Sequence, residues 1–185
     1  MNSYFYKKGF TLVEVLVVVA VIAILAAIVL ASLGAARVKG ENAATVQQVE
    51  EYITALELTY NANNRSYPYN GASNLTTYGC LVNTRGTPQG CMFNGAWVAM
   101  YPDSAGRTIL GQQIKLARLN TQIRDGQNHL FDSITYSTNG SVYRLRYPMK
   151  GVFTANSQCG VENATILNAG GVNYPGVTIC LYQSR

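Results

Sequence analysis

One unbroken apolar run constrains this chain more than any other feature. Seventeen consecutive apolar residues, Val15–Ala31, are followed by Ser32 and Leu33. At about 1.5 Å per residue, a helix of this length nearly crosses a hydrocarbon core of roughly 30 Å. Residues 10–36 hold 23 hydrophobic residues out of 27, whereas the whole 185-residue chain is 48% hydrophobic. The run therefore predicts a transmembrane helix joined to an otherwise ordinary polar protein.

A cleaved secretory signal is the first alternative for this run. Gly34, Ala35 and Ala36 follow it and offer a small-residue cleavage site. However, the run is longer than the roughly 7–15 apolar residues of a signal core. Glu14 also lies at its start, where a carboxylate is unfavourable for an ordinary signal. Both points favour a membrane-spanning helix that is retained.

The residues just before the run form a specific pattern. Two lysines precede Gly9 and Phe10, and Glu14 lies four places after that phenylalanine. The stretch Lys-Lys-Gly-Phe-Thr-Leu-Val-Glu, followed by a long apolar helix, resembles the amino terminus of a type IV pilin or pseudopilin precursor. The resemblance implies a leader peptide at residues 1–9, cleavage by a prepilin peptidase between Gly9 and Phe10, and N-methylation of Phe10.

Glu14 needs a partner because it lies at the edge of the apolar run. An ionised carboxylate costs about 2.5–3.5 kcal/mol at the centre of a membrane helix, and less toward the interface. Cleavage before Phe10 creates a positive amino group, so we expect the amine of one subunit to neutralise Glu14 of a neighbour in a filament. Thr11 and Glu14 also fit a capping box, which ties off the start of a helix. The two roles can coexist.

The helical pattern continues beyond the apolar run. Apolar residues recur at intervals of 3, 4, 3 and 4, which places them in one stripe: Val46, Val49, Ile53, Leu56 and Tyr60. Most polar residues of the segment fall outside that stripe: Gln47, Gln48, Glu50, Glu51, Thr54 and Glu57. No proline interrupts residues 10–63, so we predict one continuous helix, transmembrane over 10–36 and amphipathic over 37–63.

After residue 63 the sequence becomes rich in Gly, Asn, Ser, Thr and Tyr, which predicts a globular head over residues 64–185. Alternating patterns predict strands at Trp97–Tyr101, Ser133–Tyr136, Ser141–Tyr147 and Val177–Tyr182. Asn139-Gly140 predicts a tight hairpin turn, because this pair supplies positive φ angles. Looser helical spacing predicts a short helix over Ile109–Ile123. Together these features predict an α+β fold, with the long helix packed on a small antiparallel sheet in a pilin-like architecture.

All four cysteines lie in the head, which indicates an oxidising compartment and two disulfides. Three pairings are open, and we favour Cys80–Cys91 and Cys159–Cys180 because both close short loops. By resemblance, the second pair would bound the carboxyl-terminal loop that pilins commonly carry. A zinc site is the competing interpretation, but the chain has no C-x-x-C pair and a single histidine.

The charges divide unevenly along the chain. Residues 10–63 carry a formal charge of −3, whereas residues 64–185 carry ten basic and four acidic residues, a formal +6. Arg144 and Arg146 alternate along a predicted strand, so they share a face and form a candidate polyanion contact. The competing interpretation is a solvent-exposed face or a salt bridge to the acidic helix of another subunit.

The resemblance implies a structural subunit of a type IV pilus-like filament. Its expected partners are further copies, the prepilin peptidase, the pilus assembly machinery and the inner membrane before assembly, with the filament on the cell surface afterwards. Two alternatives stay open: a pseudopilin of a type II secretion system, and a minor pilin whose basic head binds DNA or a surface. We expect no catalytic residue, metal or cofactor, and His129, the sole histidine, is expected in a solvated loop.

Overall fold

The computed structural model describes residues 9–62, 65–68, 75, 78–80, 91–93, 96–98, 123–131, 133–169 and 174–185. The predicted leader lies outside these residues except for Gly9. Two compact units make up the chain, Met1–Lys39 and Gly40–Arg185. The second unit contains the carboxyl part of the long helix together with the strands.

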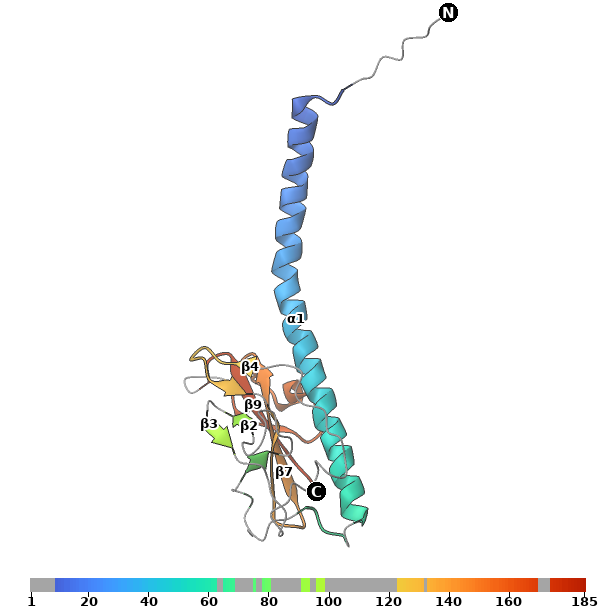
Figure 1. Cartoon of the computed structure of the whole chain (residues 1–185), viewed down its shortest axis with the longest axis vertical. Coiled ribbons are helices and arrows are strands. Elements are labelled where there is room, and N and C mark those ends of the chain that lie inside the picture. Colours follow the sequence, from blue (N-terminus) through green and yellow to red (C-terminus); the bar gives the residue numbers. More distant parts are fainter. Residues whose placement is uncertain are drawn as a thin grey trace, which may run out of the picture. The chain divides into compact units, whose positions relative to one another are not determined.

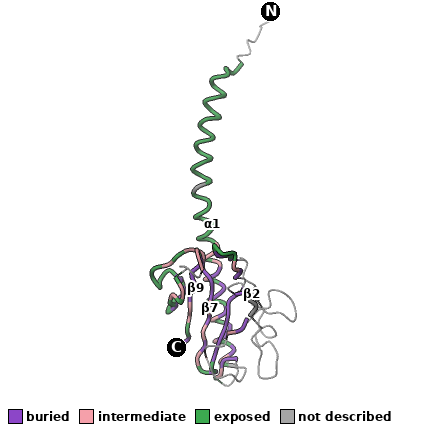
Figure 2. Tube along the Cα trace, turned by 90° about the vertical axis from the view of Figure 1, so that its left-hand side faces the viewer, coloured by how far each residue is buried: buried purple, intermediate pink, exposed green. Residues whose placement is uncertain are grey.

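The first element is the helix α1, Leu12–Ala62, which is 51 residues long. Its residues within the first unit are exposed wherever their burial is described (Figure 2). Burial begins in the second unit, where Thr45 is the first fully buried residue of α1. The same helix therefore has an apolar part without cover and an amphipathic part with a packed face.

The main sheet of the second unit is antiparallel, with strand order β1-β6-β7-β9-β8. Its paired strands β7 and β9 are labelled in Figure 1. Its strands are β1 (Gly79–Cys80), β6 (Thr135–Thr138), β7 (Tyr143–Lys150), β8 (Thr165–Asn168) and β9 (Val177–Gln183). Two small ribbons pair β2 (Cys91–Phe93) with β3 (Ala96–Val98) and β4 (Ile123–Arg124) with β5 (Leu130–Phe131). A short 3₁₀ turn, η1, spans Asn156–Cys159.

The core forms where α1 packs on the main sheet. On β7, the fully buried Tyr143, Leu145 and Tyr147 alternate with partly exposed residues, so one face of the strand points to the helix. These side chains join Val49 and Leu56 of α1 in one hydrophobic cluster. Each such side chain contributes about 1.5–3 kcal/mol when removed from water. This helix-on-sheet arrangement confirms the predicted α+β fold.

The predicted stripe on α1 is confirmed, but it is wider than predicted. All five of its members lie in or against the main cluster. Gln48 falls outside the apolar stripe in sequence, yet it is only 6% exposed. Thr45, Tyr52, Ala55 and Thr59 are buried as well. A helix packed on a sheet buries an arc of 100° or more, so polar residues beside the apolar stripe are also covered.

The predicted strands are present with shifted limits. β3, β6, β7 and β9 overlap the four predicted segments, although β6 begins two residues later than predicted and β7 extends to Lys150. Residues 99–101 of the first segment lie outside the described part of the chain. The same is true of the predicted helix Ile109–Ile123, except for Ile123 itself, which belongs to strand β4 and not to a helix.

The β6–β7 hairpin is confirmed, but one of the two positive φ angles predicted for its turn is not. Four residues, 139–142, join the paired ends of the two strands. Only Gly140 has a positive φ there, of 90°. The side-chain oxygen of Asn139 accepts the backbone N–H groups of Ser141 and Val142, at 3.1 and 2.9 Å. Asn139 therefore holds the loop with its side chain and does not supply a left-handed backbone.

Candidate assembly site

The start of α1 is closed by Thr11 and Glu14. The backbone N–H and the hydroxyl of Thr11 each donate to Glu14 Oε2 at 2.8 Å. In return, the backbone N–H of Glu14 donates to Thr11 Oγ1 at 3.2 Å. This is a reciprocal capping box, which satisfies N–H groups that have no partner inside the helix. In a single chain, Glu14 therefore acts as a cap.

The surface around this cap is apolar and uncovered. Phe10 is 86% exposed, just before the helix begins. An open groove of about 730 Å³ follows the first turns, lined by Phe10, Thr11, Leu12, Val15, Leu16, Val19, Ala20 and Ala23. Contiguous exposed apolar surface of this kind marks a membrane or protein contact. By its length and composition alone, the apolar part of α1 is long and apolar enough to cross a membrane.

The head arginines Arg144 and Arg146 have different surroundings. Arg144 is partly exposed, and its Nε donates to Gln183 Oε1 at 2.7 Å. Arg146 lies over the Tyr78 ring, with Cζ 3.2 Å from the ring centroid, and its Nε donates to Thr135 Oγ1. Burial lowers the pKa of the Arg146 guanidinium. Nearby tyrosines partly oppose that change. The two arginines share the sheet face opposite α1, but Arg146 is engaged by its aromatic neighbour.

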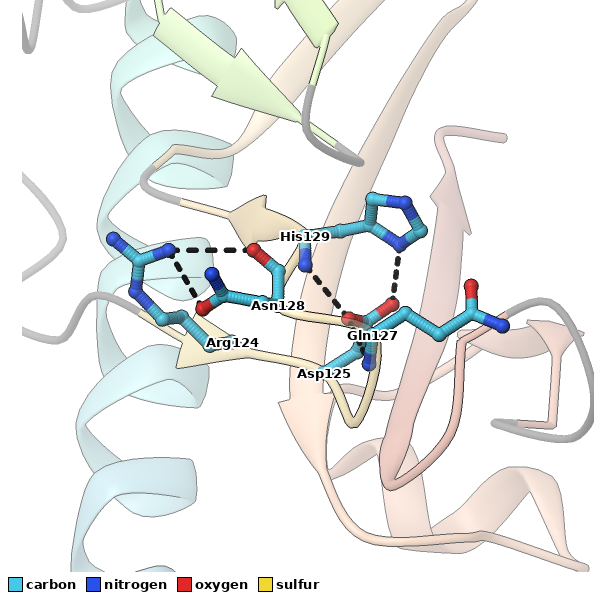
Figure 3. Close-up of polar contacts among 5 residues, drawn as sticks. All are labelled: Arg124, Asp125, Gln127, Asn128 and His129. Atoms are coloured by element: carbon cyan, nitrogen blue, oxygen red, sulfur yellow. Dashed lines mark hydrogen bonds and ion pairs between the residues drawn. The ribbon is translucent and has the colours of Figure 1, made fainter.

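His129 lies in the β4–β5 loop with its side chain 37% exposed, as expected, and it also pairs with Asp125 (Figure 3). Its Nδ1 lies 2.8 Å from Asp125 Oδ2, and its backbone N–H donates to Asp125 Oδ1 at 2.8 Å. The backbone N–H of Gln127 donates to the same oxygen at 2.9 Å. Burial alone would raise the pKa of Asp125, but these contacts outweigh it and hold that pKa below its usual value. The β4–β5 turn is thus closed by a buried carboxylate.

Two of the four cysteines form a described disulfide. Cys159, at the end of η1, is bonded to Cys180 of β9, and both are fully buried. Cys80 is also buried and disulfide-bonded. The side chain of Cys91 lies outside the described residues, so the predicted Cys80–Cys91 pairing stays a prediction. In the described part of the chain, no three His, Cys, Asp or Glu side chains gather in a way that could hold a metal ion.

Glu57 is occupied by tyrosines of the core. The Tyr67 hydroxyl donates to both of its carboxylate oxygens, at 2.9 and 3.1 Å, and the Tyr143 hydroxyl donates to Oε1 at 3.3 Å. Burial raises the pKa of both tyrosines, and the nearby Glu57 charge raises it further. Both hydroxyls therefore stay protonated donors. Glu57 therefore makes its contacts within the head.

A polar latch between α1 and the end of β7 was missed from the sequence. The Asn42 side-chain amide donates to the Lys150 carbonyl and accepts the Lys150 backbone N–H, each at 2.8 Å. The Lys150 ammonium also forms an ion pair with Glu41. These partners lie 108 residues apart in sequence, and no local motif marks them. Only the fold brings them together.

Two comparisons with known proteins bear on this chain. The prokaryotic N-terminal methylation motif matches residues 5–30, which include Gly9, Phe10 and Glu14. The chain is also 39% identical over 66 residues to the type IV wide pilus major component PilA4 of Thermus thermophilus. Both findings support the type IV pilin family. The aligned part covers 36% of this chain and half the length of that curated relative. No solved structure matches the chain.

The matched methylation motif contains both residues of the capping box, Thr11 and Glu14. The matched segment begins in the predicted leader and ends within the apolar part of α1. It therefore covers the predicted cleavage position and Glu14. The cysteines and arginines of the head lie outside this motif. The motif therefore gives no information on the role of the head.

Proposed function

We propose that this chain is the structural subunit of a type IV pilus-like filament. A prepilin peptidase removes the leader between Gly9 and Phe10, and Phe10 then carries the N-methyl group. The methylation motif over residues 5–30 and the resemblance to a major pilus component support this proposal. The observation that carries it is the bare apolar surface of α1 next to the Thr11–Glu14 capping box.

Assembly follows from what that surface requires. The apolar part of α1 has no cover in the single chain, so it needs lipid or the helices of other subunits around it. The inner membrane holds the processed subunit, and a filament replaces lipid with neighbouring helices. The new amino group of Phe10 lies within the bundle and pairs with Glu14 of an adjacent subunit. That contact fixes the axial position of one helix against the next.

The mature amino terminus provides the main test. Mass spectrometry of sheared surface material should find chains that begin at Phe10 and carry one added methyl group. Chains that keep Met1, or that begin near Ala36, would contradict the proposal. Loss of protein export from the cell, without sheared filaments, would instead identify a pseudopilin of a secretion system.

The charge of Glu14 can be separated from its capping role. Glu14→Gln keeps an oxygen that accepts the Thr11 N–H, but it removes the charge that pairs with a neighbouring amine. Filament yield should fall at least about tenfold, because a charge left unpaired in an apolar bundle costs about 2.5–3.5 kcal/mol. Membrane insertion should be unchanged.

Thr11→Ala is the matched control. It removes the hydroxyl contacts of the cap, which are worth about 1 kcal/mol of local helix stability, and it keeps the Glu14 charge. Filament yield should stay close to that of the wild type. Normal filaments with Glu14→Gln, or an equal loss with Thr11→Ala, would show that Glu14 serves only as a cap.

A further inference from the structure

One face of α1 in the second unit carries two acidic side chains that have no charged partner among the described residues. Glu50 and Glu51 are exposed, and neither forms an ion pair with a described residue. They border an open groove of about 410 Å³, lined by Gln47, Glu50, Glu51, Thr54, Ala55 and Leu58. Leu58 is 63% exposed, a large apolar side chain beside the two carboxylates. The groove thus offers two negative charges next to one apolar anchor.

The other two carboxylates of α1 in this unit, Glu41 and Glu57, have partners within the head. Glu57 accepts hydroxyl groups from Tyr67 and Tyr143, and Glu41 pairs with Lys150. The structure therefore separates two kinds of acidic residue on one helix. Glu41 and Glu57 hold the head together, whereas Glu50 and Glu51 point away from the core.

The opposite side of the head carries the complementary charge. Arg144 lies on the sheet face away from α1, since its neighbours Tyr143 and Leu145 face the helix. Gln183 pairs with Arg144 across β7 and β9. Arg185, two residues further along, is exposed like Gln183, whereas Ser184 between them is buried. Arg144 and Arg185 therefore lie on one face at the same end of the sheet.

Both guanidinium groups are held by neutral oxygen atoms. Arg144 Nε donates to the Gln183 amide oxygen at 2.7 Å, and Arg185 Nη2 donates to the Asn163 amide oxygen at 3.2 Å. Neither arginine forms an ion pair with a carboxylate among the described residues. Each arginine therefore has a hydrogen-bond partner, but no described carboxylate neutralises its charge.

We infer that Arg144 and Arg185 of one copy dock against the Glu50–Glu51 groove of a second copy of this chain. The two surfaces lie on opposite sides of the head, so each copy offers both halves of the contact. Such a heterologous contact repeats without closing on itself when its rotation does not form a ring, and it then builds an open filament. Complementary charge sets the orientation of the partners, and Leu58 adds apolar area. This inference rests on the proposed filament function.

Charge exchange in the full-length protein tests the contact. One variant carries Glu50→Arg and Glu51→Arg, a second carries Arg144→Glu and Arg185→Glu, and a third combines all four changes. Each reversed surface should lower the yield of sheared filaments at least about tenfold, because like charges then face each other. The combined variant should recover most of the wild-type yield.

One exposed residue away from these surfaces provides the control. Arg124→Glu reverses the charge at a site whose printed contacts are to Asn128 of its own turn, and it should leave the yield unchanged. The amount of processed subunit in the membrane, measured in every variant, should match the wild type, which separates a docking defect from a folding defect.

Several outcomes would overturn the inference. These are a wild-type yield in both reversed variants, a combined variant whose yield is no better than that of either, or an equal loss of yield in Arg124→Glu. If the Arg144 and Arg185 changes abolish binding of double-stranded DNA and leave filaments intact, this surface binds a polyanion instead of a second copy. A wild type without sheared filaments overturns the proposed function and the contact together, whereas normal filaments in all variants overturn only the contact.

Discussion

Gly160→Ala should destabilise the second unit because two separate costs meet at this residue. Gly160 follows η1 with a φ of +77°, in the left-handed region. A β carbon there would lie 2.6 Å from Cγ2 of Val46 on α1. The left-handed backbone costs a non-glycine residue about 1–2 kcal/mol, and overpacking typically costs about 1–3 kcal/mol. The expected loss is therefore about 2–5 kcal/mol in the free energy of unfolding.

Gly176→Ala isolates the backbone cost. Gly176 has the same φ of +77°, but a β carbon at this position would meet nothing within 4 Å. It should lose only the conformational part, about 1–2 kcal/mol. Adding Val46→Ala to Gly160→Ala should remove most of the steric part, because the methyl groups that clash are gone. The cost of Gly160→Ala should then approach that of Gly176→Ala.

Urea unfolding of the full chain in detergent micelles, followed by near-ultraviolet circular dichroism of the tyrosines, measures these differences. A double-mutant cycle between Gly160 and Val46 should give a coupling of about 1–3 kcal/mol. Equal losses for Gly160→Ala and Gly176→Ala would refute the close approach of η1 to α1. The same conclusion would follow if Val46→Ala did not reduce the cost.

Three further changes test other contacts. Replacing Cys159 and Cys180 by serine should lower the free energy of unfolding by about 3 kcal/mol, for a separation of 21 residues, and an unchanged urea midpoint would argue against a structural disulfide. Leu56→Ala should cost about 2–5 kcal/mol, because Leu56 is fully buried, whereas Leu58→Ala on the exposed side should stay within about 0.5 kcal/mol. The folded pKa of Asp125 is lowered, so its contribution is present above the unfolded value of about 3.9 and is lost as the pH falls through the folded value. Asp125→Asn should therefore flatten the fall of melting temperature below about pH 4, and an unchanged acid profile would contradict this role.

The elements that the sequence predicted are those with a long periodic signal. Five apolar residues recur at helical spacing between Val46 and Tyr60, and this stripe packs on the sheet as expected. The alternation along β7 is equally regular, with Tyr143, Leu145 and Tyr147 on one face. In both cases one side of an element is buried over many residues, so the period appears in the sequence.

The missed features depend on contacts that no local pattern records. β1 has two residues, too few to show alternation. Gln48 is polar, yet it is buried at the margin of the helix–sheet interface. The Asn42–Lys150 latch joins residues 108 positions apart. Asp125 and His129 are close in sequence, but their pairing requires the β4–β5 turn that aligns them. Each of these follows from tertiary packing, which composition and period do not determine.

The proposed assembly also explains why one carboxylate matters beside so much apolar surface. Fourteen large aliphatic side chains between Leu12 and Leu30 are exposed in the single chain. At about 1 kcal/mol or more for each partly exposed side chain, transfer to water would cost on the order of 15–30 kcal/mol, so the subunit does not leave the membrane as a soluble monomer. Transfer from lipid to a bundle of identical helices is different, because lipid tails are as apolar as the neighbouring side chains and this large term nearly cancels. The free-energy difference between the subunit in the membrane and in the filament is then only a few kcal/mol. The pairing of Glu14 with a neighbouring amine contributes about 2.5–3.5 kcal/mol to this difference. Glu14 can therefore decide between membrane and filament, although it supplies only a small part of the energy that keeps the helix out of water.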